Sequence, residues 1–128
     1  MRAVVASLFD LEIEEVPNFI ALPEDSWFRT WRIFWNSNGY SSVSTCRVKG
    51  NEENAKAIMK MDGGVNGYFF GVVDSQTFPG ECTHAVVIDS NMNIVHDPNP
   101  NGLALRLRPE DVLDVMVKGE SINNFFKK

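Results

Sequence analysis

Three segments of the chain show the apolar spacing of helices. Residues 2–9, "RAVVASLF", carry apolar side chains on most sides, as expected of a helix that is largely buried. Residues 25–38 place Trp and Phe side chains at a three- and four-residue spacing, and Gly39 supplies the C-terminal stop. Residues 51–64 predict a third, more exposed helix that ends at a Gly-Gly pair. The wide aromatic face of the second helix is predicted to belong to the core.

Other segments show the composition of strands. Residues 40–48 alternate weakly, and residues 68–74, "YFFGVVD", form a β-rich run that predicts a central strand. The segment "CTHAVVIDSNMNIVHDPNPNG", residues 82–102, predicts two strands joined by a turn. The secondary structure of residues 103–118 is not decided by the sequence. Pro109 with the acidic residues after it favours a helix start, whereas the following apolar run equally favours a strand.

Together these elements predict an α+β fold in a single domain, residues 1–128. Runs of helices and of strands that are not regularly alternated favour an antiparallel sheet. We expect about four to six strands, with the N-terminal helix packed on the sheet.

The hairpin in residues 82–102 contains both histidines of the chain. If Ser90 and Asn91 form a two-residue loop, facing residues sum to 181 and His84 faces Asp97. Directly opposed side chains have Cβ atoms about 5 Å apart, which is within imidazole–carboxylate reach. A carboxylate that fixes the tautomer of a histidine is the base and orienting pair of nucleophilic catalysis. The alternative is a buried hydrogen bond that only stabilises the hairpin.

A nucleophile for this pair is not evident. Cys82 would point to the same face as His84 at about 6–7 Å, too far for a tight thiol–imidazole hydrogen bond without a bulge. Cys82 is most simply a small, half-buried cysteine, and Cys46 is predicted to belong to the core. A metal site is not expected, because His96 should face away from His84 and Asp97.

Composition narrows the function classes further. The chain has 128 residues and a formal net charge of −5, without a Lys/Arg cluster, which argues against nucleic-acid binding. Two cysteines make no disulfide framework, so reduced thiols and a cytoplasmic location are expected. We expect no membrane span, because no apolar run reaches the necessary length, and we expect no cofactor.

Two motifs resemble a known family. The runs "RAVVASLF" and "EEVPNF" near the start, with "HAVVI" and "VHDPNP" later, are similar to small bacterial and phage proteins with a papain-like cysteine hydrolase fold. That group is akin to bacteriocin-processing cysteine peptidases and butirosin-type acyltransferases. The resemblance implies that His84 is the catalytic base, that Asp97 orients it, and that the substrate is a peptide or amide.

The resemblance also places the family's catalytic cysteine immediately before the position of Met1, so this chain lacks it. Three explanations are open. The chain is clipped at its N-terminus, or the protein is a pseudoenzyme that keeps the cleft, or Cys82 or Cys46 has taken over the role.

The expected function is therefore that of a papain-like cysteine peptidase or amidohydrolase that retains the His–Asp pair without its nucleophile. The alternative is a non-catalytic binding or inhibitor protein that holds a protein partner in the cleft or on its acidic surface. The family interpretation further predicts that Met1 or Arg2 lies near His84, because the first helix should begin at the cleft. The sequence is silent on the oligomeric state.

Overall fold

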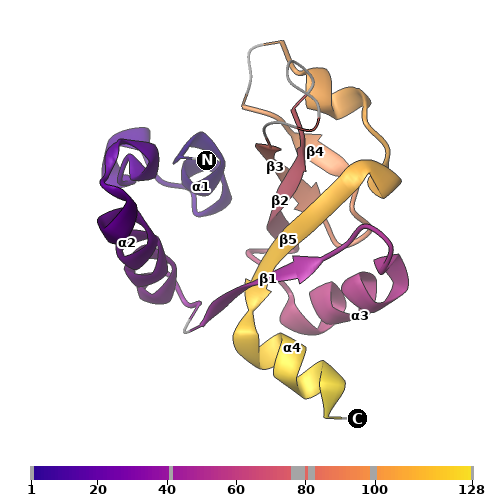
Figure 1. Ribbon diagram of the computed structural model, residues 1–128. Coiled ribbons are helices and arrows are strands. Elements are labelled where there is room, and N and C mark those ends of the chain that lie inside the picture. The colour runs from indigo at the N-terminus through magenta and orange to yellow at the C-terminus, as the bar shows by residue number, and fades with distance from the viewer. Residues whose placement is uncertain (1, 41, 76–79, 81–82, 99–100, 128) are drawn as a thin grey trace.

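A computed structural model describes residues 2–40, 42–75, 80, 83–98 and 101–127 of the chain. Over these residues the fold is α+β, with four helices and a five-stranded antiparallel sheet (Figure 1). The helices are α1 (Arg2–Leu8), α2 (Glu24–Ser37), α3 (Glu52–Asp62) and α4 (Gly119–Phe126). The strands are β1 (Val43–Arg47), β2 (Tyr68–Asp74), β3 (Thr83–Asp89), β4 (Ile94–His96) and β5 (Val112–Lys118). Short 3-10 turns cover 13–15, 19–21, 103–106 and 109–111.

The strand order is β1-β5-β2-β3-β4, so β2 is the central strand, as its apolar run predicted. Its side chains alternate between two cores. Phe69 and Val73 pack with α3 and α4, whereas Phe70 and Val72 pack with α1 and α2. The helices accordingly cover both faces of the sheet, with α1 and α2 on one side and α3 and α4 on the other (Figure 1). The predicted packing of the N-terminal helix on the sheet is confirmed.

The aromatic face of α2 fills the core on the α1 side of the sheet. Trp31 and Trp35 are buried, and their rings contact Phe70 of β2 with centroids 5.4 and 6.0 Å apart. Phe19 packs edge-to-face on Trp31 at 5.0 Å. Edge-to-face pairs add a small favourable term to the area that they bury. The spacing therefore identified this core correctly, although Phe28 on the same helix stays exposed.

In the ambiguous segment 103–118, the structure shows the strand and not the helix of the two alternatives. Pro109–Asp111 form a single 3-10 turn, and the chain then enters β5. The strand conformation is the more stable one here because β5 pairs with β1 on one side and with β2 on the other. This pairing satisfies the backbone hydrogen-bonding groups along both edges of β5. Helix α4, which follows directly, was not predicted.

Asp62 joins the ends of three elements. Its side chain is buried at the end of α3 and accepts hydrogen bonds from Lys118 N (2.7 Å), Ser121 Oγ (3.0 Å) and Gly64 N (3.0 Å). The carboxylate therefore ties the last residue of β5 and the first turn of α4 to α3. A buried carboxylate is tolerated where several donors compensate its lost hydration.

No helix in the described part of the chain is long and apolar enough to cross a membrane.

Candidate active site

The turn between β3 and β4 differs from the predicted two-residue loop. Asp89 N donates to Asn93 O at 3.1 Å and Met92 N donates to Asp89 O at 2.9 Å, so three residues, Ser90 to Met92, form the loop. Met92 has a φ of 65° and a buried side chain. A left-handed third residue is typical of three-residue hairpin loops. Met92 takes this backbone conformation because its side chain is anchored in the core.

The predicted register of the hairpin was wrong for the same reason. Ile88 pairs with Ile94, and Val87 pairs with His96, so the pairing shifts by one residue at Val95. Continued by one residue, this register brings Asp97 level with Val86, diagonal to His84. Diagonal neighbours across two strands lie within reach of long side chains.

The expected contact between His84 and Asp97 is nevertheless present. His84 Nε2 lies 2.5 Å from Asp97 Oδ1, a distance at which the two groups share a short hydrogen bond. Asp97 follows β4 directly, and its second oxygen, Oδ2, accepts from Ala104 N at 3.0 Å. An ionised Asp97 requires Nε2 to donate, which leaves Nδ1 as the acceptor nitrogen of the neutral ring.

The two side chains differ in how far they are exposed to solvent. The Asp97 side chain is 1% exposed, whereas that of His84 is 30% exposed. The carboxylate is thus held inside while one part of the imidazole reaches the surface. Because Nε2 is engaged, Nδ1 is the nitrogen that can exchange a proton with a group outside. A base held by an orienting carboxylate needs one ring nitrogen bonded to the carboxylate and the other free; here the carboxylate is on Nε2, whereas in the Ser-His-Asp triad it is on Nδ1.

His84 lies on the face of the sheet opposite to α1. By the alternation along β3, His84 shares a face with Val86 and Ile88, which pack in the core next to α3. Its cross-strand neighbour Val73 belongs to the same core. Helix α1 instead packs with Val87 on the other face. A group at the start of α1 could therefore meet His84 only by passing around the start of β3, where His84 is the second residue.

Two sequence predictions fall on residues that the structure does not describe. Met1 and Cys82 both lie outside the described residues. Arg2, the next residue of α1, donates from Nε to Val16 O at 2.7 Å, so its guanidinium is held by the segment that follows the helix. The predicted closeness of the chain start to His84 therefore stays a prediction, as does the role of Cys82.

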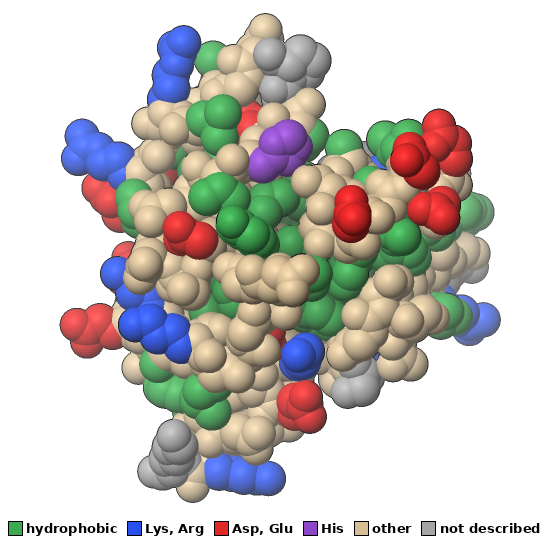
Figure 2. Space-filling model, turned by 180° about the vertical axis from the view of Figure 1, so that it is seen from behind, with side chains coloured by type: hydrophobic (Ala, Val, Ile, Leu, Met, Phe, Trp, Pro, Cys, Tyr) green, Lys and Arg blue, Asp and Glu red, His purple; other side chains and the backbone are tan. Residues whose placement is uncertain are grey.

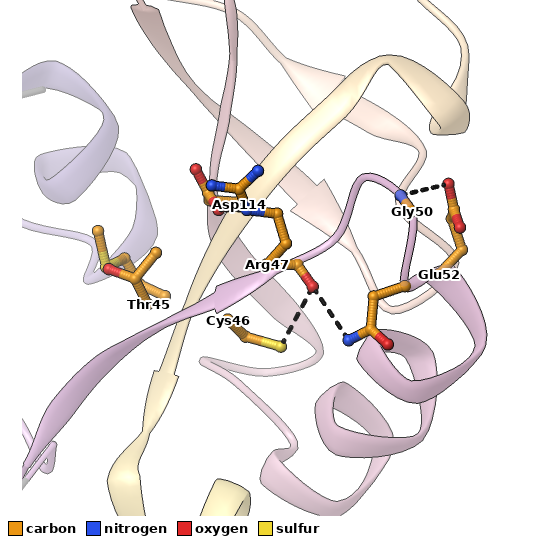
Figure 3. A network of polar contacts seen from close by, with 8 residues as sticks. Thr45, Cys46, Arg47, Gly50, Glu52 and Asp114 are labelled. Carbon is orange, nitrogen blue, oxygen red and sulfur yellow. Dashed lines mark hydrogen bonds and ion pairs between the residues drawn. The ribbon is translucent and has the colours of Figure 1, made fainter.

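Cys46 cannot be the missing nucleophile for His84. It lies on the edge strand β1, and strands β5 and β2 separate it from β3. Three strand spacings amount to about 14 Å. Its thiol lies 3.8 Å from Arg47 O, and burial, followed by the Asp114 carboxylate, raises its pKa (Figure 3). A raised pKa lowers the thiolate fraction, so Cys46 is a structural cysteine.

Among the residues that the structure describes, the remaining titratable groups form no second centre. His96 faces Val87 and is exposed on the opposite side of the sheet from the pair, as predicted. Across the described residues, no group of three or more His, Cys, Asp or Glu side chains is arranged to hold a metal ion.

No family model, curated protein or solved structure matches this chain.

Proposed function

We propose that His84 and Asp97 are the base and orienting residue of a papain-like cysteine peptidase or amidohydrolase whose nucleophile is absent from this chain. The observation that carries the proposal is the 2.5 Å contact between Nε2 of the partly exposed His84 imidazole and Oδ1 of the buried Asp97 carboxylate. Asp97 is itself held by Ala104 N, so the carboxylate is fixed before any substrate arrives. Helix α1 packs on the face of the sheet opposite to His84, so a cysteine before Met1 would have to reach the imidazole around the start of β3.

The chemistry assigned to the pair is acyl transfer from a peptide or amide. A cysteine thiol placed beside Nδ1 of His84 would lose its proton to that nitrogen, and the thiolate would attack the carbonyl carbon. The imidazolium would return the proton to the departing amine, and water would then release the acyl group from sulfur. Asp97 would stabilise the imidazolium through Nε2 throughout.

The test supplies the missing group. A cysteine is added immediately before Met1 in a background with Cys46→Ser and Cys82→Ser, so that the new thiol is the only one. Its alkylation by iodoacetamide is measured from pH 4 to pH 10. We expect the rate to inflect well below the pKa of about 8.5 of a free thiol, because an imidazolium and a helix N-terminus stabilise the thiolate.

Two variants make this test specific. His84→Ala should move the inflection up to the free-thiol value, whereas His96→Ala, which removes the other histidine from the opposite face, should leave it unchanged. An inflection that stays at the free-thiol value even with His84 present would refute the assignment of the nucleophile to this position.

A non-catalytic binding protein is the second candidate, and one observation favours it. Both oxygens of Asp97 are engaged within the fold, by His84 and by Ala104 N, which ties β4 to the turn at 103–106. In this role the pair stabilises the hairpin and the surface holds a protein partner. Acidic side chains gather on the side of the molecule that carries α1 and α2 (Figure 2). Alkylation that does not depend on His84 would favour this candidate.

A further inference from the structure

A cavity of about 340 Å³ lies between the last turns of α2 and the start of β1, far along the sheet from His84. Arg29, Arg32 and Asn36 line it from α2, and Ser42 and Val43 line it from the strand side. In Figure 1, α2 and β1 meet at a narrow junction and diverge from it. The volume suits a small organic ligand.

The lining of this cavity is positively charged in an acidic protein. The chain has 17 Asp and Glu residues, yet the described residues that line the cavity include no carboxylate. Arg29 and Arg32 are exposed, and neither guanidinium forms an ion pair with any residue whose side chain the structure describes, which leaves out Glu24 and Asp25. Guanidinium groups bind carboxylates and phosphates through paired N–H donors. The charge therefore selects an anion.

The C-terminus of α2 lies beside the cavity, and its carbonyl groups repel an anion less than unpaired carbonyl groups would, because most of them accept hydrogen bonds. Ser37 Oγ donates to Ile33 O at 2.9 Å, and Asn38 Nδ2 donates to Phe34 O at 2.8 Å. Backbone N–H groups of residues 38–40 bond the carbonyls of residues 35 and 36. With these carbonyls satisfied, two full positive charges outweigh the partial negative charge of the helix end.

Tyr40 forms a buried part of the cavity wall. It lines the cavity, it is 2% exposed, and its hydroxyl has no hydrogen-bond partner among the described residues. Burial, with a smaller effect of the Asp62 carboxylate, raises the pKa of Tyr40, so the hydroxyl keeps its proton at neutral pH.

A second cavity of about 310 Å³ adjoins the first and is apolar. Val43 lines both. Trp27, Phe28 and Met116 line the second, and the Phe28 ring is 54% exposed although it is large and hydrophobic. Arg32 lines the first cavity, and its guanidinium lies 5.8 Å from the centre of the Phe28 ring, which lines the second. An exposed aromatic side chain beside a charged recess is a feature of ligand sites.

We propose that these two cavities form one binding site for a small amphipathic oxyanion. Arg29 and Arg32 hold its carboxylate or phosphate, and its aromatic or aliphatic body lies across Val43 onto Phe28. The site is independent of the His84–Asp97 pair, since it lies at the other edge of the sheet.

The experiment titrates the 128-residue protein with 4-phenylbutyrate and follows backbone amide shifts by NMR. Acetate, which has the head alone, and 4-phenylbutyramide, which has a neutral head, are the matched probes. We expect phenylbutyrate to shift the amides of residues 27–36 and 42–45, with an affinity at least tenfold above that of either matched probe. Phenylbutyl phosphate in a parallel titration distinguishes the head group, because the tighter of the two anions identifies it.

Variants then assign the site. Arg29→Gln with Arg32→Gln should weaken phenylbutyrate at least tenfold, and Phe28→Ser should weaken phenylbutyrate without affecting acetate. Arg106→Gln, which removes an exposed arginine elsewhere, should change nothing. Unchanged amide spectra in the variants show that each is folded. Equal affinity for phenylbutyrate and its amide, shifts centred on other residues, or no shift at millimolar concentrations would each overturn the proposal.

Discussion

The side chains of His84 and Asp97 are in contact although the two residues are not paired across their strands. Val87 pairs with His96 after a one-residue shift, so the contact runs diagonally from β3 to the residue that follows β4. The contact survives the shift because an imidazole is long enough to span a diagonal pair. Two errors in the predicted hairpin, the loop length and the straight register, thus left the predicted contact intact.

Asp97→Asn tests whether this contact supports the fold as well as the imidazole. The amide keeps the size of the carboxylate but weakens the charge-assisted bond to His84. We expect the free energy of unfolding to fall by about 1.5–3 kcal/mol, as for other hydrogen bonds to charged groups. Urea denaturation measures this change. Asp114→Asn, at a more exposed carboxylate, is the control and should lie within about 0.5 kcal/mol of the parent. Equal effects in both variants would contradict a special role for Asp97.

Asp62→Ala should be among the most destabilising polar substitutions in the chain. It leaves the Lys118 and Gly64 N–H groups and the Ser121 hydroxyl without their acceptor. Each buried group without a partner costs about 1–3 kcal/mol, so we expect a loss of about 2–5 kcal/mol in urea denaturation. Ser121→Ala removes one donor and keeps the acceptor, and should cost about 0.5–1.5 kcal/mol. A smaller loss for Asp62→Ala than for Ser121→Ala would show that Asp62 does not organise this junction.

Gly71→Ala should strain the central strand. A Cβ at this position would lie 2.8 Å from Ile88 Cγ2 on β3. Overpacking of this kind typically costs about 1–3 kcal/mol, measured as the shift in the denaturation midpoint. The double variant with Ile88→Ala provides the check, because removal of the Ile88 branches gives the new methyl group room. The two substitutions should therefore be less destabilising together than the sum of their separate effects, and strict additivity would argue against the clash.

Cys46 should be slow to alkylate in the folded protein. Burial and the Asp114 carboxylate raise its pKa above the ordinary thiol value, so the thiolate fraction at pH 7 falls. In a Cys82→Ser variant, iodoacetamide should modify the folded chain at least tenfold more slowly than the same chain in urea. The rate in the folded state should still be rising at a pH where a free thiol has levelled off. Fast modification of the folded variant at pH 7 would mean that Cys46 is accessible and reactive.

Local sequence determined most of the secondary structure. The apolar run of "YFFGVVD" became β2 with no change of bounds, because alternate residues had a core to enter on each face of the sheet. Gly63 ends α3 in the left-handed conformation that glycine adopts without strain. The α+β class and the proximity of His84 and Asp97 also followed from the sequence, since helix and strand periods and a short turn are local properties.

Tertiary structure decided what depended on distant partners. The local pattern of residues 112–118 left helix and strand equally favoured, and pairing with β1 on one edge and β2 on the other decided for the strand. The burial of Met92 selected the three-residue loop and with it the register of β4. The separation of Cys46 from His84, and the meeting of Arg29 and Arg32 with the start of β1, depend on strand order. Strand order is a property of the assembled sheet, because it is set by which faces can be buried together.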